Sequence, residues 1–526
     1  MSERRALNGL RYFAVPALAI AATGGIFLAN LRRYTFLSDD AFISFRYAHH
    51  LVQGLGLVWN VGEAVEGYTN FLWVLLMAGA LALGLRPEVI SNALGITSGV
   101  GVLTALVVFS ARATSWRNPL IWLAPLTLAT SRSFVAWCTG GLETMFFTLL
   151  VLLAFLRFVR EHERREEAPV GSALLFAAAT LTRPEGALFA AVAGSALVLE
   201  CLRGRRSLRA VTLFAVPYAT VVGAHLLWRH ATYGFWLPNS FYAKVPGAAW
   251  EKGARYLFTF HEEYRILWFL PLTLPALVLG RRHAAGLFFA AIATYLLYVA
   301  FVGGDWFEFR FLVVVLPLLY WLLAESLVCL VERARPGRLR LAVATLAAVA
   351  AGLLVVATHV GSRRPEARRL APYGITSIEG IDRYARSRIA EGRFLRQLID
   401  EGVLPRDLRI AVSGAGAVPY YTDWPTLDLH GLNDVEIAHS PIAKRGWIGH
   451  ERSASLELLR RRNVAVVDVV NRLVHDSRID RRVRGARLYP ELPLQVIPVR
   501  GRYFKFATPL SREELARALA PLELAD

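Results

Sequence analysis

The chain has 526 residues, of which 55% are hydrophobic and only 19% charged, whereas soluble globular proteins carry about 25% charged residues. A formal net charge of +18 is common among nucleic-acid-binding proteins, but here the basic residues cluster in short loops between apolar blocks. Membrane proteins that keep Lys and Arg on the cytoplasmic side show this distribution, so we exclude a nucleic-acid partner.

The apolar blocks are close in length to the ~20 residues that a helix needs to cross a bilayer. They predict a polytopic α-helical membrane protein, and a path of eleven spans keeps every basic loop in the cytoplasm. The expected spans lie near residues 12–31, 90–110, 118–136, 142–158, 170–182, 186–202, 209–229, 265–280, 284–302, 309–330 and 339–359. With Arg4 and Arg5 inside, an odd number of spans places the C-terminus outside.

Two apolar blocks depart from the simple pattern. Residues 71–85 are expected to form a short interfacial or re-entrant helix, because a full crossing would move the basic cluster at 160–165 to the outer side. Residues 170–182 and 186–202 are expected to be two short helices, because Pro184 breaks the helical pattern between them.

The same path places several polar segments outside the cytoplasm. They are residues 37–70, 139–143, 182–186, 233–244, 303–310 and everything beyond about 360. We therefore expect a transmembrane catalytic domain over residues 1–360 and an extracytoplasmic α/β domain over residues 361–526. In the second domain, a helix is expected at 381–401 and strands at 408–414, 464–470, 494–499 and 503–508.

Asp39 and Asp40 are adjacent acids at the end of the first expected span. Ionisable groups at a membrane interface are costly, which indicates a function. One of them could cap the following helix, since helix N-termini attract acids. The pair could also hold a divalent cation, or one carboxylate could accept a proton from a hydroxyl group. Both side chains are expected to face water.

Other acids are candidates with structural alternatives. Glu66 lies in a Glu-Gly turn, where Tyr68 could serve the aromatic belt of the membrane. Glu143 could cap the helix that follows it. Asp305 follows two glycines that let backbone approach a ligand closely, and Arg310 lies five residues further on.

Arg183 and Lys244 are cations within the expected outer segments. Arg offers a bidentate fork to phosphate and Lys offers a point charge, so both could bind a phosphate group. Alternatively, each could extend to lipid headgroups.

The aromatic and histidine motifs are less specific. His49 and His50 would point about 100° apart on a helix, so neither is expected to be a metal ligand. Tyr420, Tyr421 and Trp424 could stack on sugar rings or belong to the core of the outer domain. The sequence has no glycine-rich nucleotide loop after a strand and no Walker motif.

Seven motifs in order resemble the GT-C glycosyltransferases, and more closely the terminal β-(1→2)-arabinofuranosyltransferases and their bacterial relatives. The motifs are DDAFISFRYAHHLVQGLGLVWN, VEGYTNFLW, CTGGLET, LTRPEG, GFWLPNSFYAK, GGDW and AVPYYTDWPTLDLHGLND, between about residues 37 and 435. The resemblance implies a GT-C-like fold, a sugar donor linked to a lipid phosphate, and a catalytic aspartate in the first outer loop. Asp39 and Asp40 carry that last pattern.

Other residues of these motifs are expected to bind substrate. They are Glu66, Tyr68, Glu143, Arg183, Asn239, Tyr242, Lys244, Asp305 and Arg310. The donor phosphate is expected near Arg183 and Lys244, and a divalent cation could be held by Asp39 and Asp40.

The sequence thus predicts a glycosyltransferase of the plasma membrane. It would move a sugar, foremost arabinofuranose, from a polyprenyl-phosphate donor to a glycan acceptor of the cell envelope, among membrane lipid and on the outer face. A donor carrying mannose or another hexose is the first alternative. A lipid-linked sugar transporter is the second, but it needs access from both sides and often inverted repeats, which this sequence lacks.

Overall fold

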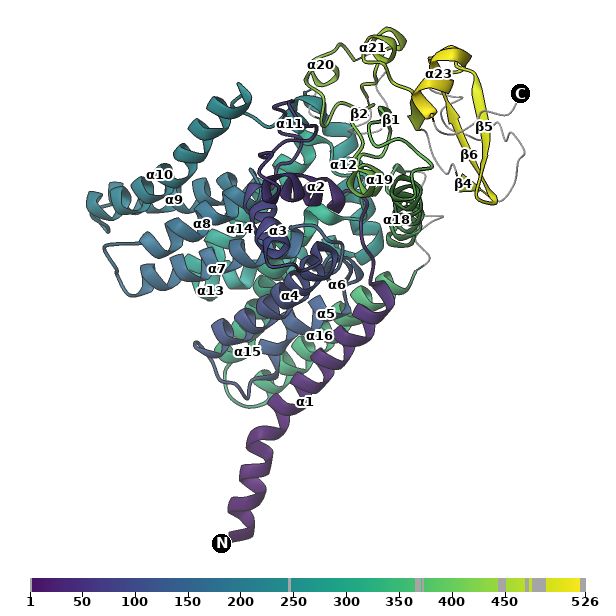
Figure 1. The fold of residues 1–526 in the computed structure, drawn as a ribbon. Helices are drawn as coiled ribbons and strands as arrows, with labels where there is room; N and C mark the ends of the chain where they lie inside the picture. The colour runs from purple at the N-terminus through teal and green to yellow at the C-terminus, as the bar shows by residue number, and fades with distance from the viewer. Residues whose placement is uncertain are drawn as a thin grey trace. The chain divides into compact units, whose positions relative to one another are not determined.

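The computed structural model describes residues 2–244, 247–364, 370, 373–442, 451–468, 473–474 and 489–520. These residues are mostly helical and form two compact units. Unit 1 consists of Met1–Phe36, Ser91–His225 and Ala248–Glu379, and unit 2 of Leu37–Ile90, Leu226–Gly247 and Gly380–Asp526. Figure 1 follows the chain from the purple N-terminal helix α1 to the yellow strands β5 and β6.

In the described residues of unit 1 the regular structure is helical, apart from one isolated bridge between Phe307 and Thr376. Its helices are α1 (Ser2–Tyr34), α4 (Pro87–Ala111), η1 (Pro119–Trp122), α5 (Leu123–Thr130), α6 (Arg132–Ala136), α7 (Thr144–Glu163), α8 (Val170–Thr182), α9 (Gly186–Leu202), α10 (Leu208–Tyr233), α12 (Trp250–Tyr264), η2 (Ile266–Thr273), α13 (Leu274–Leu279), α14 (Arg282–Val302), η3 (Arg310–Val315), α15 (Leu316–Arg333) and α16 (Arg338–Arg363). The start of α4 and the end of α10 belong to unit 2.

The expected membrane character is present. Within the described residues, six helices are long and apolar enough to cross a membrane, and α15 is the most buried of them. The six segments are Ala14–Tyr34, Pro87–Ala111, Leu208–Tyr233, His283–Val302, Arg310–Arg333 and Arg338–Arg363. All eleven expected spans fall on helical backbone, but the other five are shorter, interrupted or less apolar, so the number of crossings stays a prediction.

Two of the expected segments have a specific local structure. The block at 118–136 is divided into η1, α5 and α6, because Ser131 adopts an extended backbone conformation between the last two helices. The block at 71–85 forms α3 (Phe71–Ala82), whose 12 residues extend only about 18 Å. This helix is too short to cross ~30 Å of hydrocarbon, as expected, and its place at the interface stays a prediction.

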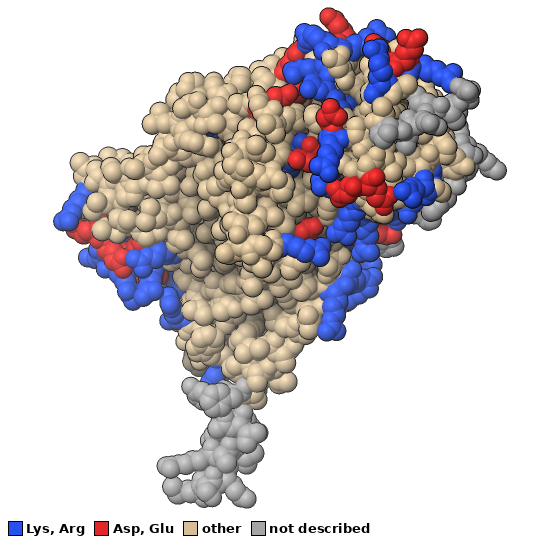
Figure 2. Space-filling model, in the orientation of Figure 1, with Lys and Arg blue, Asp and Glu red and all other residues tan. Residues whose placement is uncertain are grey.

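Charged side chains of unit 1 gather at the loops that join its apolar helices. Figure 2 shows them at the ends of α7 to α10, with uncharged surface over the helices themselves. Arg157 near the end of α7 pairs with Glu161 of the same helix and with Glu166 of the following loop, and after α9 Arg206 donates to the carbonyl oxygens of Glu161, His162 and Glu166. These basic residues thus lie in the loops or near helix ends, and the side of the membrane that they face stays a prediction.

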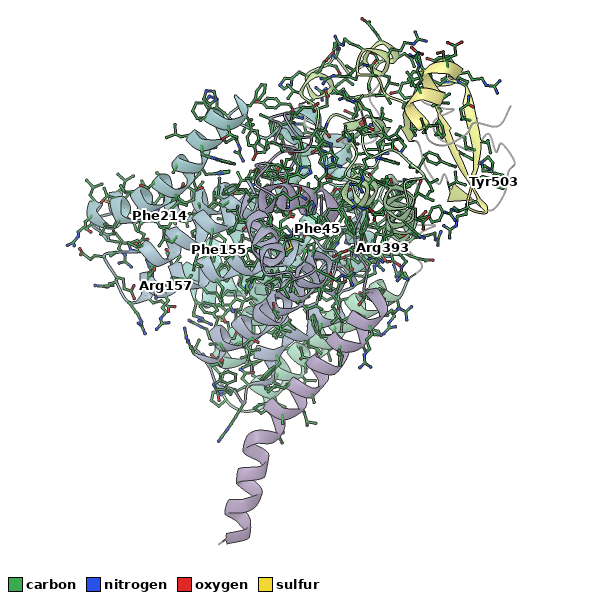
Figure 3. All side chains as sticks on the ribbon, in the orientation of Figure 1. Phe45, Phe155, Arg157, Phe214, Arg393 and Tyr503 are labelled. Carbon is green, nitrogen blue, oxygen red and sulfur yellow. The ribbon has the colours of Figure 1, made fainter. Side chains whose placement is uncertain are left out.

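Aromatic rings fill the interior between helices of unit 1. Phe155 contacts the rings of Phe176 and Phe288, and Phe214 contacts Phe158 and Phe176 (Figure 3). Several pairs meet edge to face, the arrangement favoured by the charge distribution of aromatic rings.

Unit 2 combines helices with a mixed sheet. Its helices are α2 (Ala41–Val52), α3, α11 (Asn239–Lys244), α18 (Ile378–Asp400), α19 (Ala417–Thr422), α20 (Val435–Ala438), α21 (Leu456–Arg461) and α23 (Arg512–Leu519). Its strands are β1 (Ile410–Val412), β2 (Thr426–Asp428), β3 (Val466–Asp468), β4 (Leu473–Val474), β5 (Leu494–Val499) and β6 (Arg502–Ala507). The compact unit that contains most of residues 361–526 thus also includes the first polar loop.

The strand order is β2-β1-β3-β6-β4, and β5, which lies off this path, also pairs with β6. β1 is parallel to β2 and β3, with Ile410 opposite Thr426 and Val466, and β6 is antiparallel to its neighbours. Arg500 and Gly501 both have positive φ, which suits the two-residue turn between β5 and β6. Strands occur at all four expected places, although 469–470 lie outside the described residues, and β2 and β4 were not expected.

Arg46 on α2 ties the first polar loop to the C-terminal segment within unit 2. Its guanidinium is 2% exposed and donates to the carbonyl oxygens of Trp59 (2.9 Å), Pro419 (2.6 Å) and Trp424 (3.0 Å). It also lies over the Trp59 ring at 4.6 Å. A buried cation needs such partners, since an unpaired one is very costly to desolvate.

Candidate functional site

Asp39 and Asp40 lie between the end of α1 and the start of α2. Asp40 occupies the N-cap position of α2, but its side chain makes no capping hydrogen bond. Asp39 is only 4% exposed, so the expectation that both side chains face water is wrong for Asp39. The cause is the C-terminal segment, whose backbone covers this carboxylate.

The Asp39 side chain is held by the start of α19. Its Oδ1 accepts a hydrogen bond from the Ala417 N–H at 2.9 Å. Burial raises the pKa of Asp39 to about 6, although the Ala417 N–H and Arg388 act to lower it and Asp40 and Glu391 to raise it. A carboxylate with this pKa can accept a proton near neutral pH.

The turn after β1 reaches Asp39 because it contains glycine. A Cβ added at Gly416 would lie 2.1 Å from the Asp39 carbonyl oxygen and 2.4 Å from its Cγ. At Gly414, a Cβ would lie 3.3 Å from Asp39 Oδ2 and 2.1 Å from the Tyr384 hydroxyl. Any side chain at Gly416 would therefore displace Asp39 or the turn.

Glu66 forms a buried ion pair with Arg229 of α10. The distances are 2.6 Å from Nε to Oε2 and 3.1 Å from Nη2 to Oε1, which is a bidentate arrangement. The Glu66 carbonyl accepts from the Asn239 N–H at 2.9 Å, and the Tyr68 hydroxyl lies 3.2 Å from that of Tyr233. Glu66 therefore anchors the first polar loop, and its role in substrate binding stays a prediction.

The expected residues of the 233–244 segment also lie in unit 2. Asn239 is buried and donates through Nδ2 to the carbonyl oxygens of Gly431 (2.8 Å) and Leu432 (3.0 Å). Tyr242 is half-buried and its ring lies 4.7 Å from that of His439, while Lys244 is half-buried at the end of α11. The structure thus brings VEGYTN, the 233–244 segment and the DLHGLND motif together.

Unit 1 contains a second charged cluster. Arg183 lies between two carboxylates, with Nη1 at 2.5 Å from Glu143 and Nη2 at 2.7 Å from Glu185. Arg310 pairs through Nε with Asp305 at 2.7 Å. The Phe311 ring lies 5.3 Å from the Arg183 guanidinium carbon and 5.4 Å from that of Arg310. The TGGLE, TRPEG and GGDWFEFR segments therefore meet within unit 1.

This pairing changes the interpretation of Arg183. Both of its terminal nitrogens are bonded to carboxylates, so a phosphate would have to displace one of them. In the part of the chain that the structure describes, Arg310 pairs with a single carboxylate. Glu185 and Phe311 were not identified as candidate residues from the sequence. Glu185 could have been, because it lies two residues after Arg183 in the LTRPEG motif.

The histidines and aromatic residues are now placed. His50 is buried between the Val58 carbonyl (2.9 Å) and Asp423 (3.0 Å), and His49 is half-buried. Trp424 is core, with its indole N–H donating to the Pro405 carbonyl. Tyr420 and Tyr421 are half-buried against Phe42. Stacking on a sugar ring and a purely structural role in the core both stay open for them.

Asp39 and Asp40 were expected to be possible ligands of a divalent cation. Within the described ranges, no group of three or more His, Cys, Asp or Glu side chains could hold an ion. Hard divalent cations take six or more oxygen ligands, and one oxygen of Asp39 is already bonded to Ala417. A divalent cation held by Asp39 and Asp40 stays a prediction.

Comparison with known proteins confirms the expected resemblance. The chain is 27% identical over 368 residues to the terminal β-(1→2)-arabinofuranosyltransferase of Corynebacterium glutamicum, covering 61% of this chain and 52% of that protein. It is 26% identical over 275 residues to the protein of the same name from Mycobacterium tuberculosis, covering 49% and 43%. The chain thus spans about half the length of these curated relatives.

Two further similarities concern the fold and the C-terminal segment. The structure resembles ArnT from Cupriavidus metallidurans, solved with bound undecaprenyl phosphate, with a TM-score of 0.57, 12% identity and coverage of 97% of this chain and 99% of that one. This similarity shows a shared fold. Residues 379–512 match a family described as Domain of unknown function (DUF8728).

The pairing of Arg183 predicts different consequences for the two expected phosphate-binding cations. Arg183→Met should lower the free energy of unfolding by about 3–5 kcal/mol, because Glu143 and Glu185 are left buried without their cation. Lys244→Met should change it by less than about 1 kcal/mol, because Lys244 is half-buried at a helix end. Thermal unfolding of both purified variants in detergent measures this difference. Equal melting temperatures would contradict the structural role of Arg183.

Proposed function

We propose that this chain is a membrane glycosyltransferase that moves arabinofuranose from a polyprenyl-phosphate donor to a cell-envelope glycan. The observation that carries this proposal is the buried carboxylate of Asp39, bonded to Ala417 and with a pKa of about 6, in the first polar loop. The named function of the two curated relatives supports the reaction and the sugar. The ligand of the solved neighbour supports a lipid-phosphate donor.

The proposed reaction assigns one role to each group. Asp39 accepts the proton of the acceptor hydroxyl. At the same time the oxygen of that hydroxyl forms a bond to the anomeric carbon of the sugar. The bond between that carbon and the donor phosphate breaks, and polyprenyl phosphate leaves with the electron pair. Lys244, in the same unit as Asp39, is assigned to the phosphate, where a cation stabilises the charge that develops.

The donor class is tested with purified protein in lipid vesicles. Polyprenyl-phosphate arabinofuranose should support transfer to an arabinan fragment, and a soluble nucleotide sugar should not, because the fold and relatives favour a membrane-bound donor. Polyprenyl-phosphate mannose in a parallel reaction tests the hexose alternative. Transfer from the nucleotide sugar alone would overturn the proposal, and movement of donor between leaflets without covalent transfer would indicate a transporter.

The role of Asp39 predicts a specific pH dependence. Because its pKa is about 6, activity should rise as pH increases through about 6 and the carboxyl ionises. Asp39→Asn should reduce turnover by about 100-fold or more. It should leave the protein folded, since the amide oxygen can still accept from Ala417 and a buried charge is removed. Asp400→Asn, in the half-exposed pair with Arg396, is the matched control.

Asp40→Asn belongs in the same series, since it shows which of the two adjacent acids is required. Wild-type turnover in both Asp39→Asn and Asp40→Asn would remove the first polar loop from the mechanism.

We also propose that the site faces the outside of the plasma membrane, because basic loops favour the cytoplasmic side and the polar segments of the site fall on the other side of the expected path. Single cysteines at Ala168→Cys and Ser453→Cys test this, because both positions are exposed. The background replaces Cys138, Cys201 and Cys329 by alanine. An impermeant maleimide should label position 453 in intact spheroplasts and position 168 only after lysis. Labelling of 168 before lysis would contradict this orientation.

A further inference from the structure

The segment that matches a family without an assigned function supplies the surroundings of Asp39. Residues 379–512 include almost all of α18, all of β1 and the whole of α19. The residue that donates to Asp39, Ala417, is the first residue of α19. The two glycines that come closest to Asp39 lie in the turn between β1 and α19.

Two sets of hydrogen bonds hold the backbone of this turn and of α19 against the first polar loop. Gly416 adopts φ −106° and ψ −109° as the N-cap of α19 and presents the Ala417 N–H to Asp39 Oδ1. A few residues later, the Pro419 and Trp424 carbonyls accept hydrogen bonds from buried Arg46 of α2. Asp39, which immediately precedes the Asp40 N-cap of α2, is therefore connected to the turn directly and through α2.

The charges around Asp39 come from α18 and from its own turn. On α18, Arg388 and Glu391 form a buried ion pair at 2.8 Å, with side chains 2% and 5% exposed. α18 packs against the turn that holds Asp39, since a Cβ added at Gly392 would lie 2.9 Å from the Ala417 carbonyl oxygen and one at Gly414 would lie 2.1 Å from the Tyr384 hydroxyl. Arg388 favours the ionised form of Asp39, and Glu391 and Asp40 oppose it.

We propose that the 379–512 segment is a built-in part of the catalytic centre, in which the Ser413–Ala417 turn positions Asp39 and α18, packed against this turn, places the Arg388–Glu391 ion pair beside it. This inference rests on the proposed function of Asp39 as the proton acceptor. It gives the segment a role in the reaction step itself. Gly416, Arg388 and Glu391 are positioning residues, since they act through Asp39.

The first test moves Asp39 without changing its charge. Gly416→Ala should lower kcat by about 100-fold, because a displacement of about 1 Å at a reacting group costs that much, and should leave the KM for the polyprenyl-phosphate donor unchanged. The matched control is Gly79→Ala in the same unit, where an added Cβ meets nothing within 4 Å. Equal kcat in the two variants would overturn the positioning role of the turn.

The second test changes the charges beside Asp39. In the pH profile of kcat, Arg388→Gln should move the acid limb to higher pH and Glu391→Gln should move it to lower pH, each by at least about 0.5 unit. Arg388→Lys should retain the wild-type profile, since it keeps the charge, and it also controls for misfolding of the Gln variant. If the Arg388–Glu391 pair had only a structural role, the two Gln variants would not shift the acid limb of the pH profile in opposite directions.

A third measurement needs no substrate. Because folding raises the pKa of Asp39 from 3.8 to about 6, the ionising carboxylate makes the folded protein less stable as pH rises through that window. Melting temperature against pH, recorded for each charge variant with and without Asp39→Asn, isolates this contribution. The upper limit of this pH window, which is the folded-state pKa of Asp39, should move up in Arg388→Gln and down in Glu391→Gln.

The two proposals can fail separately. Wild-type protein that transfers no sugar from any donor would end the proposed function, and the stability titration would still decide whether α18 controls Asp39. An active enzyme whose acid limb and stability window stay fixed in both charge variants would overturn the inference alone.

Discussion

The buried guanidinium of Arg46 is the interaction on which the candidate site depends most. It sits in the first polar loop, yet two of its acceptors are backbone carbonyls of the C-terminal segment. Its removal would take from the Trp59 carbonyl the one donor that the described residues give it, and an unsatisfied buried group costs about 1–3 kcal/mol. The Pro419 and Trp424 carbonyls would each lose one of two donors, since they also accept from the Asp423 N–H and the Thr426 hydroxyl. Because these carbonyls flank the end of α19, the same bonds hold in place the N–H that reaches Asp39.

Hydrophobic content and charge placement were sufficient to predict the helices. Every expected span lies on helical backbone, since a long apolar run between basic loops has few other solutions in a membrane. The break at Ser131 was missed because nothing in its neighbourhood, neither Gly nor Pro, marks an interruption. β2 was missed because its three residues, Thr426–Asp428, give too short a pattern to recognise.

The sequence indicated which residues belong to the candidate site, but it did not indicate how buried they are or which residues they pair with. Asp39 was expected in water because its neighbours in sequence are at the end of a span, whereas its cover comes from residues 378 positions away. Arg183 was expected to be available for phosphate, and it lies between Glu143, 40 positions away, and Glu185. Composition shows which charges exist, but which of them neutralise each other depends on tertiary contacts that no local pattern encodes.

The long separation between Asp39 and Ala417 has a consequence for biosynthesis. At about 5–20 residues per second, a ribosome needs roughly 20–75 s to make the chain between them. During that interval the first polar loop has emerged, but the backbone that covers its carboxylate does not yet exist. The nascent protein therefore carries a solvated Asp39 with an ordinary acidity, and the carboxylate becomes buried only once the chain has been made beyond Ala417. A chain cut short by a premature stop codon before that point would contain most of the apolar helices and still lack the backbone N–H that holds Asp39.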